Sequence, residues 1–309
     1  MEIYKKLSSI VKKYPKPVIA LGMFDGVHIG HASIIRRAVE LAKSIGGTSM
    51  VFTFSNHPLS IIAPENEPLA IGNRSLRRRL VENLGVDVLI DIAFTKELSR
   101  RSPEEFMQLL KDKFAPSIVV TGPNYTFGRF GKGNGRMLLR ESEAYGFRAE
   151  VCPAITVNRK TVSSTRIRAL IKDGELDSAN ELLGRPFTYV STVVHGERRG
   201  RKLGFPTANL EIAEGRAMLP NGAYAVRVSI DDKNYCGIAN VGNNPTFGAV
   251  KRRLEVYIDQ FNGDLYGREL GVEFLKQLRA EQTFSGATEL AAQLRADLER
   301  AQKFFSNIN

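Results

Sequence analysis

The chain is 309 residues long, 43% hydrophobic and 25% charged, which indicates an ordinary soluble protein of about two domains. Its net charge of +11 suits a polyphosphate substrate as well as nucleic acid, but the basic residues lie in scattered short clusters, which argues against a nucleic-acid-binding protein. Two cysteines far apart in the sequence imply no disulfide framework, and no apolar run has the length of a membrane span, so we expect a cytoplasmic protein with no membrane partner.

The first half of the chain alternates short apolar runs with segments of helical spacing, after an N-terminal stretch that does not resemble a signal peptide. The expected strands are 18–24, 49–54, 87–92, 117–121 and 149–153, and the expected helices are 31–45, 75–84, 103–114 and 137–145. Ser102 and Glu105 form a capping box around a proline, which marks the start of the third helix. Strands and helices that alternate in this way are joined by right-handed crossovers, so we expect a Rossmann-like, doubly wound parallel sheet.

The run Gly22-Met-Phe-Asp-Gly-Val-His-Ile-Gly-His31 follows the first expected strand directly. Ligands of such sheets bind beyond the carboxyl ends of the strands, where this turn falls. Its glycines let the backbone approach phosphates, and the following helix directs free N–H groups and its positive dipole end at them. The imidazoles of His28 and His31 can stabilise charge on a phosphorus under attack. The run predicts an enzyme that acts on ATP; a metal pair and an ordinary helix start are the alternatives.

A second motif, Ser163-Ser-Thr-Arg-Ile-Arg168, lies just before another helical stretch. Hydroxyl groups at a helix start could serve only as caps. Capping does not call for an arginine at position 168, however, and this guanidinium could neutralise the β and γ phosphates of ATP. A glycine-rich tract at 131–135 lacks the Gly-Lys-Ser/Thr ending of a P-loop, so we expect a mobile loop there.

The second half of the chain has the periodicity of strands. Apolar residues alternate with others over 224–230 and 254–258, and Asn262-Gly263 is a hairpin signal between two such runs. Helical spacing returns only over 285–304. We therefore expect a small antiparallel β-barrel with a C-terminal helix, and a division of the chain into domains 1–183 and 184–309.

The run Gly200-Arg-Lys-Leu-Gly-Phe-Pro-Thr-Ala-Asn209 is the main candidate site of the second half. Thr207 and Asn209 are two residues apart on an extended strand, so their oxygens share a face and can ligate Mg²⁺ that bridges ATP phosphates. A barrel strand with polar residues facing water is the alternative. Glu255 is at one of the polar positions of the alternating strand 254–258. An exposed glutamate with a purely structural role would occupy the same kind of position, so the spacing does not show whether Glu255 is catalytic.

Together these motifs resemble the bacterial bifunctional riboflavin kinase/FMN adenylyltransferases, also called FAD synthetases. The Gly22–His31 run followed by Ser-Ser-Thr-x-Ile-Arg is similar to their adenylyltransferase half. The Pro-Thr-Ala-Asn run, the Glu-Val-Tyr-Ile strand and the turn at 261–267 are similar to their riboflavin kinase half. The resemblance implies that the chain phosphorylates riboflavin to FMN and adenylylates FMN to FAD, with ATP as co-substrate and Mg²⁺ as cofactor.

The resemblance also implies roles for individual residues. His28 and His31 would stabilise the α-phosphate of ATP during attack by the FMN phosphate, with Ser164 and Arg168 on the phosphates that leave as pyrophosphate. Glu255 would accept the proton of the riboflavin 5′-hydroxyl. Arg279 would lie near the flavin or nucleotide, with a surface salt bridge as its alternative. The residues expected to bind nucleotide or flavin are Gly22, Phe24, Asp25, Gly26, Gly30, His57, Asn124, Tyr125, Phe127, Ser163, Ser164, Thr165, Lys202, Gly204 and Arg279.

Two segments of the first half depart from the family pattern, and so do Asn243 and Asn244 in the second half, where the family usually has a bulkier or basic residue. Asn56-His57-Pro58 stands where the family usually has Pro-His-Pro, and the flavin-side loop at 122–128 lacks the usual acidic residue and first phenylalanine. Asn124 can still form hydrogen bonds and Tyr125 can still stack on a ring. The first alternative is therefore a riboflavin kinase with a weakened or redirected N-terminal half, and the second is an RNA-binding or adenylating protein. The sequence does not fix the oligomeric state and leaves weak self-association open.

Overall fold

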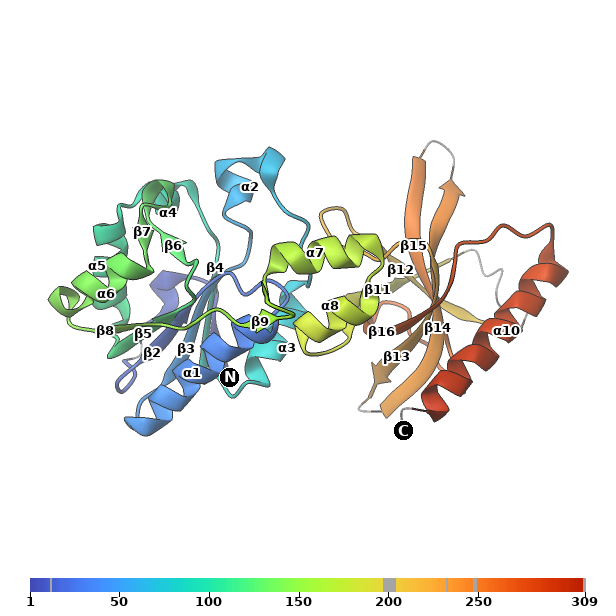
Figure 1. Ribbon diagram of the computed structural model, residues 1–309, viewed down its shortest axis with the longest axis horizontal. Helices are drawn as coiled ribbons and strands as arrows, with labels where there is room; N and C mark the ends of the chain where they lie inside the picture. The colour runs from blue at the N-terminus through green and yellow to red at the C-terminus, as the bar shows by residue number, and fades with distance from the viewer. Residues whose placement is uncertain (12, 197–203, 232, 247–248, 308–309) are drawn as a thin grey trace. The chain divides into compact units, whose positions relative to one another are not determined.

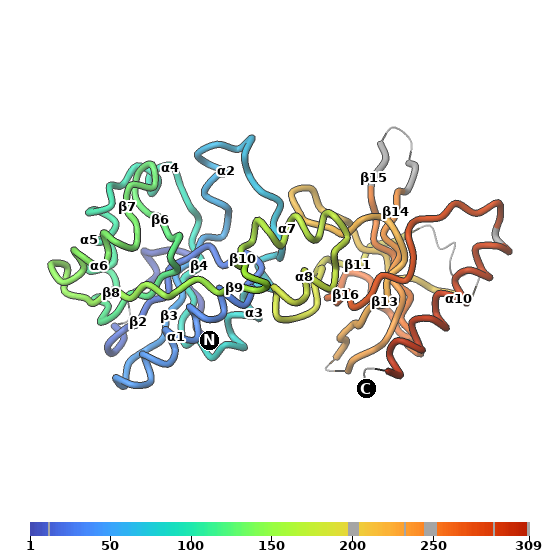
Figure 2. Tube along the Cα trace, viewed as in Figure 1, coloured from blue at the N-terminus to red at the C-terminus, as the bar shows by residue number. Residues whose placement is uncertain are grey.

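The computed structural model describes residues 1–309 except for 12, 197–203, 232, 247–248 and 308–309, and except for the side chains at 244–251 and 287. The chain forms two compact units, Met1–Pro68 with Asn73–Ser164 and Leu69–Gly72 with Thr165–Asn309. Figures 1 and 2 show the course of the chain through the elements of each unit. In the described part of the chain, no helix combines the length and apolar character needed to cross a bilayer.

The first unit is built on a six-stranded parallel sheet in the order β1-β4-β3-β2-β5-β8 (Figure 1). The strands of this sheet are β1 (Glu2–Tyr4), β2 (Val18–Leu21), β3 (Ser49–Phe54), β4 (Val88–Ile92), β5 (Ile118–Thr121) and β8 (Arg148–Val151). Almost every residue of β2 to β5 is buried, because helices cover both faces of the sheet. These strands are therefore mostly apolar in sequence, with few polar interruptions such as Asp91 of β4, which made them recognisable.

The described part of the first unit also contains six α-helices. They are α1 (Ile29–Ser44), α2 (Leu59–Ile62), α3 (Arg74–Glu82), α4 (Lys96–Arg100), α5 (Pro103–Phe114) and α6 (Gly135–Glu141), with 3₁₀ turns at Leu7–Ser9, Pro64–Asn66, Arg129–Gly131 and Ser142–Tyr145 and short strands β6 (Thr126–Phe127), β7 (Gly133–Asn134), β9 (Thr156–Val157) and β10 (Lys160–Thr161). Val18 and Ala20 of β2 pack in one apolar cluster with α1, whereas Ile19 and Leu21 pack in a second cluster with α5. The predicted doubly wound parallel sheet is confirmed.

The glycine-rich tract at 131–135 differs from the expected mobile loop. It completes a 3₁₀ turn, forms β7 and begins α6. The side chain of Asn134 caps α6 by accepting a hydrogen bond from the Met137 N–H at 3.1 Å. The expectation of a mobile loop was wrong because this asparagine cap was overlooked.

The second unit contains a closed β-barrel, with two helices before the barrel strands in the sequence and one helix after them. The barrel strands are β11 (Phe187–Val194), β12 (Thr207–Glu211), β13 (Gly222–Ile230), β14 (Lys233–Thr246), β15 (Ala249–Ile258) and β16 (Glu269–Ala280), preceded by α7 (Ser164–Asp173) and α8 (Leu176–Leu183) and followed by α10 (Ala287–Ser306). Neighbouring strands run antiparallel in the closed order β11-β12-β15-β14-β13-β16. Ala301 and Phe305 of α10 pack on Ala225 and Ile238 of the barrel. The predicted barrel and C-terminal helix are confirmed.

The hairpin predicted at Asn262-Gly263 was wrong. β15 pairs with β12 and β14, and β16 pairs with β11 and β13, so the strands on either side of this dipeptide are not neighbours. An Asn-Gly pair favours a turn, but the pairing of a strand in a closed barrel depends on which strand edges are still open. Residues 259–268 therefore form a connection across the barrel.

Helix α8 and the segment Leu69–Gly72 both belong to the second unit. The Asn180 amide of α8 donates to the Phe274 carbonyl at 3.1 Å and accepts from the Phe187 N–H at 2.6 Å, which ties α8 to two barrel strands. Ala70 forms a parallel bridge with Arg216. The compact units thus divide at the start of α7, whereas the expected boundary between 183 and 184 lies at the end of α8.

Candidate functional site

The loop between β2 and α1 has a strained backbone. Phe24, Gly26 and Val27 have φ angles of 49°, 78° and 37°, all in the left-handed region. A β-branched residue rarely adopts this conformation, which persists only where the surroundings over-determine it. Phe24 is fully buried, and a Cβ on Gly22 would lie 2.8 Å from its ring. Close packing of the Phe24 ring against Gly22 therefore helps to fix the path of this loop.

The two histidines of the loop lie together at the start of α1. His28 is the N-cap residue: its Nδ1 accepts a hydrogen bond from the His31 N–H at 3.1 Å. The two imidazole rings stack with centroids 3.6 Å apart, and a Cβ on Gly30 would lie 3.2 Å from the His28 ring. Because Nδ1 accepts, a neutral His28 carries its proton on Nε2 and can donate from that atom. The arrangement provides an imidazole donor at the positive end of a helix dipole.

Ser164 connects the second motif to this loop. Its Oγ donates to the main-chain carbonyl of Asp25 at 3.0 Å. Ser163 is half-buried and Thr165 is exposed. Arg168 lies in the second unit, where its Nε donates to the Leu69 carbonyl at 2.6 Å. The structure therefore joins Ser164 to the Gly22–His31 run, and the phosphate-binding role of Arg168 stays a prediction.

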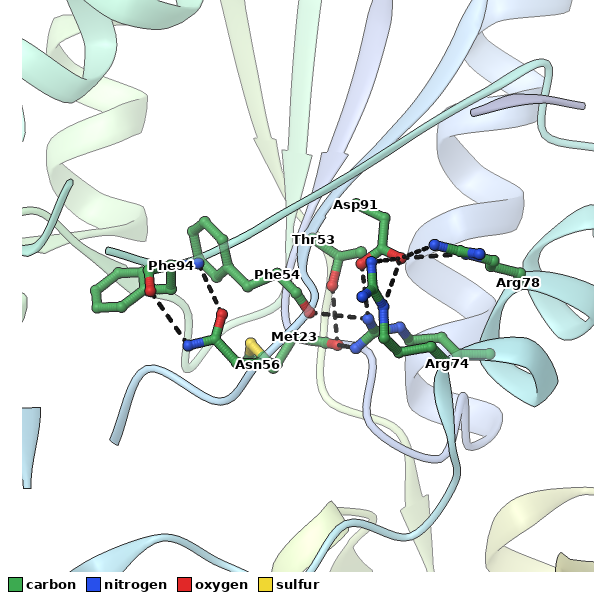
Figure 3. A network of polar contacts seen from close by, with 9 residues as sticks. Met23, Thr53, Phe54, Asn56, Arg74, Arg78, Asp91 and Phe94 are labelled. Carbon is green, nitrogen blue, oxygen red and sulfur yellow. Dashed lines mark hydrogen bonds and ion pairs between the residues drawn. The ribbon is translucent and has the colours of Figure 1, made fainter. Parts of the chain in front are cut away.

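The departure at Asn56-His57-Pro58 has a structural explanation. The Asn56 side chain accepts from the Phe94 N–H at 2.8 Å and donates to the Phe94 carbonyl at 3.2 Å (Figure 3). These bonds join the segments that follow β3 and β4, and a proline at position 56 could not make them. His57 accepts from the Leu59 N–H through Nδ1 at 3.1 Å, which fixes its ring at the start of α2.

A buried carboxylate that is paired with three arginines lies next to the loop between β2 and α1. Asp91 of β4 is fully buried and forms ion pairs with Arg74, Arg77 and Arg78 of α3 at 3.1, 2.9 and 2.9 Å. Figure 3 shows this network. Burial lowers the pKa of the Arg77 guanidinium, although the carboxylates of Asp91 and Asp25 favour its charged form. In the sequence these arginines belong to one of the scattered basic clusters, and the overlooked signal of their burial was a lone aspartate within an apolar strand.

In the flavin-side loop at 122–128, some of the predicted binding residues are exposed and others are buried in the core. Asn124 is exposed. Tyr125 is half-buried and stacks on Phe127 with ring centroids 5.9 Å apart, and Phe127 in turn packs on Phe106 in the core. Burial raises the pKa of the Tyr125 hydroxyl, so this group stays neutral at physiological pH. The predicted contacts of Asn124, Tyr125 and Phe127 with flavin are not tested by this geometry.

In the second unit, the candidate metal ligands and the candidate base lie on neighbouring strands. Asn209 of β12 is the register partner of Glu255 of β15, which is also paired with Asn240 of β14. Directly opposite residues of an antiparallel pair project from the same face. Thr207 is two residues from Asn209 on the same strand and shares this face. The sequence predicted the face shared by Thr207 and Asn209, but not their pairing with Glu255.

A cavity of about 610 Å³ opens beside Thr207 and Asn209. Its lining includes Thr207, Asn209, Gly196, Asp264 and Tyr266. A Cβ at Gly196 would overlap the Asn209 amide in its present position, so the absence of a side chain at position 196 makes room for it, and this contact was not predicted from the sequence. The Asn209 Nδ2 donates to the Thr207 carbonyl at 3.3 Å, which leaves the amide oxygen as the atom able to ligate a cation.

The remaining predicted residues of the second unit lie as follows. Lys202 is outside the described residues, and Gly204 is exposed with φ at 81°. Arg279 forms a buried ion pair with Asp297 of α10 at 2.9 Å, with side chains only 10% and 1% exposed. Gln293 also donates to Asp297, at 2.8 Å. The surface salt bridge considered for Arg279 is thus a buried one, and its contact with flavin or nucleotide stays a prediction.

Comparison with known proteins gives matches to both halves of the chain. The family model for FAD synthetase matches residues 11–166, and that for riboflavin kinase matches residues 183–305. The chain is 33% identical over 303 residues to the bifunctional riboflavin kinase/FMN adenylyltransferase of Bacillus subtilis, covering 97% of this chain and 96% of the relative. It is 35% identical over 294 residues to the protein of the same name from Listeria monocytogenes, covering 94% and 93%.

One solved structure also matches nearly the whole chain. The crystal structure of a protein described as a macrolide-efflux protein from Streptococcus pneumoniae matches with a TM-score of 0.85 and 33% identity, over 97% of this chain and 98% of that one. This likeness concerns the fold and sequence, and that description applies to the Streptococcus protein. With the family matches, it confirms the resemblance drawn from the motifs.

Proposed function

Because the chain belongs to the bifunctional riboflavin kinase/FMN adenylyltransferase family, we propose that it makes FMN from riboflavin and then FAD from FMN. The observation that carries this proposal is the presence of two candidate sites, each on its own compact unit. The stacked histidines and Ser164 belong to the α/β unit, whereas Asn209 and Glu255 belong to the barrel. Two activities in one chain need two such sites.

In the adenylyl transfer, an oxygen of the FMN phosphate attacks the α-phosphorus of ATP. A new P–O bond forms, the bond between the α-phosphorus and its bridging oxygen breaks, and pyrophosphate leaves. The FMN phosphate is already ionised, so no base is needed. The Nε2–H of His28 and the neighbouring His31 would stabilise the charge that develops on the α-phosphate, aided by the N-terminus of α1. Ser164 and the glycines of the loop would hold the remaining phosphates.

In the kinase reaction, the 5′-hydroxyl of riboflavin attacks the γ-phosphorus of ATP. The O–H proton passes to the carboxylate of Glu255, a P–O bond forms to the flavin, and ADP leaves with the former bridging oxygen. Glu255 lies opposite Asn209, so a proton acceptor and a phosphate-orienting residue share one face of the barrel. The cavity of about 610 Å³ beside Asn209 has room for substrate groups, although Glu255 is not among its described lining residues.

The oxygen atoms beside this cavity suit Mg²⁺. The Thr207 hydroxyl and the Asn209 amide oxygen are hard donors, and Mg²⁺ is typically held by few protein ligands together with water and phosphate oxygens. When bound, the ion would neutralise charge on the transferred phosphoryl group. The protein's own contribution is to hold Asn209 in place, through its bond to Thr207 and its contact with Gly196.

Chromatography of the products tests the proposed function. The unaltered chain is incubated with riboflavin, ATP and Mg²⁺, and samples are withdrawn over time. FMN that appears first and is then converted to FAD supports both activities. FMN that accumulates without FAD would support the second candidate, a riboflavin kinase with a redirected N-terminal half, which the altered loop at Asn124 and Tyr125 favours. Absence of both products would contradict the proposal. We further propose a cytoplasmic location, with small-molecule substrates, weak self-association and neither nucleic acid nor a membrane as a partner.

A further inference from the structure

The main-chain carbonyl of Met23 is held by two buried side chains. The Thr53 Oγ1 donates to it at 3.0 Å, and Nη1 of Arg77 donates to it at 3.3 Å. Thr53 is on β3 and has no exposed surface, and Arg77 is on α3 and is 9% exposed. Met23 is the last residue before the strained stretch that begins at Phe24. The carbonyl is thus fixed at the point where the loop leaves the sheet (Figure 3).

Arg77 also joins the ends of the neighbouring strands. Its Nη2 donates to the Phe54 carbonyl at 2.8 Å and to Asp91 Oδ1 at 2.9 Å. One guanidinium therefore connects the segment after β2 with the ends of β3 and β4. A lysine carries the same charge but lacks the planar fork that reaches these acceptors together.

Arg77 is not well explained as a stabilising residue. Its Nε is buried and has no hydrogen-bond partner within the described part of the chain. A buried donor without a partner lowers the stability of the fold, and a buried ion pair contributes little net stability compared with apolar side chains of similar volume, although removing one partner of the pair is costly. The presence of the guanidinium is better explained by the carbonyls to which it donates.

The strained loop needs such support. Phe24 and Val27 are non-glycine residues with positive φ, and they lead directly to His28 at the start of α1. Such strain persists at functional sites only when neighbouring groups enforce it. We infer that Thr53 and Arg77 are positioning residues for adenylyl transfer. By fixing the Met23 carbonyl they hold the loop in the path that places His28 and His31 where the α-phosphate of ATP binds. This inference rests on the proposed adenylyltransferase activity.

Thr53→Val tests the inference with little change of shape. The substitution removes one donor to the Met23 carbonyl, and the matched control is Thr121→Val. Thr121 is the last residue of β5, is equally buried, and its hydroxyl has no hydrogen-bond partner in the described structure. For adenylylation of supplied FMN, we expect Thr53→Val to lower kcat about fivefold, the effect of one lost hydrogen bond. We expect Thr121→Val to leave kcat unchanged.

Arg77→Lys is the second variant, and it separates charge from geometry. We expect it to lower the adenylylation kcat about 10- to 100-fold, with the KM values for ATP and FMN within about twofold, since displaced catalytic groups reduce the rate of the chemical step. The riboflavin kinase rate of the same chain serves as an internal control and should not change. A general loss of folded protein would lower both rates, so a lower adenylylation kcat together with an unchanged kinase rate would show a specific effect on the first unit.

Three results would overturn the inference. The first is equal adenylylation kcat for Thr53→Val and Thr121→Val, and the second is a rise in KM with kcat unchanged. The third is full adenylylation by a folded Arg77→Lys chain; should that chain not fold, the threonine pair decides. If the unaltered chain made no FAD from FMN, the proposed adenylyltransferase activity itself would fail, and the inference with it.

Discussion

The hydroxyl of Ser164 donates a hydrogen bond to the main-chain carbonyl of Asp25 at 3.0 Å, although 139 residues separate them in the sequence. This bond brings the two motifs of the first half to one place. It also holds the strained loop in place, since Asp25 lies between Phe24 and Gly26, both of which have positive φ. The candidate adenylyl-transfer site therefore depends on a contact that closes a very long loop.

Loss of this contact should reduce FAD formation. We expect Ser164→Ala to lower kcat/KM for adenylylation of FMN by about three- to tenfold, because one hydrogen bond contributes about 1 kcal/mol net. Steady-state assays with FMN and ATP measure this change. The control is the kinase rate of the same protein with riboflavin, which should remain at the level of the unaltered chain. A Ser164→Ala protein with unchanged adenylylation would show that the bond does not support catalysis.

Two substitutions at His28 should separate its structural and chemical roles. Asparagine at this position can still cap α1, so we expect His28→Asn to retain helix stability and lose FAD formation by more than about 100-fold. His28→Ala loses both the cap and the imidazole, and should destabilise the helix by about 1 kcal/mol in addition. Thermal unfolding and product assays are measured side by side. Substantial FAD formation by His28→Asn would mean that His28 acts only as a cap.

The kinase site should require Mg²⁺ held in part by Asn209. Treatment with EDTA should stop FMN formation, and added Mg²⁺ should restore it. We expect Asn209→Ala to raise the Mg²⁺ concentration for half-maximal kinase rate by at least about tenfold, the usual cost of disturbing a metal site. Adenylylation of supplied FMN provides the reference, since that site lies on the other unit. An unchanged Mg²⁺ dependence would assign Asn209 a purely structural role.

The buried carboxylate of Asp91 should be important for the stability of the first unit. We expect Asp91→Asn to lower the free energy of opening of β4 by about 3–5 kcal/mol, because three arginines lose their common charged partner. Hydrogen exchange resolved to peptides from β4 measures this loss. The matched control is Asp231→Asn, which removes an exposed carboxylate paired with Arg268 and should have no measurable effect. Equal protection in both variants would contradict this account of the network.

Much of the first unit could be predicted from the sequence, for a physical reason. β2 and β5 are covered on both faces, so they appear as unbroken apolar runs that need no knowledge of their partners. Helix α5 was equally clear, because its capping box and proline are local signals. The turn at His28 and His31 was recognisable because its glycines and histidines are contiguous.

The features that escaped prediction depend on distant parts of the chain. Asn209 and Glu255 are opposite each other only because the barrel closes in one register, which no local pattern specifies. The Asn262-Gly263 hairpin was wrong for the same reason. Arg77 resembles a surface residue in a basic run until β4 supplies a buried aspartate beside it. Burial of a charge is thus a property of the assembled sheet, which explains why the network around Met23 was not anticipated.

Complementation between two inactivated chains tests the two-site account most directly. Glu255→Gln should make no FMN from riboflavin but still adenylylate supplied FMN, whereas His31→Ala should make FMN and stop there. The two proteins are mixed with riboflavin, ATP and Mg²⁺, and the products are separated by chromatography. The account predicts that the mixture forms FAD although neither protein does so alone. A mixture that accumulates FMN without FAD would contradict it, because the two reactions would then not take place at independent sites.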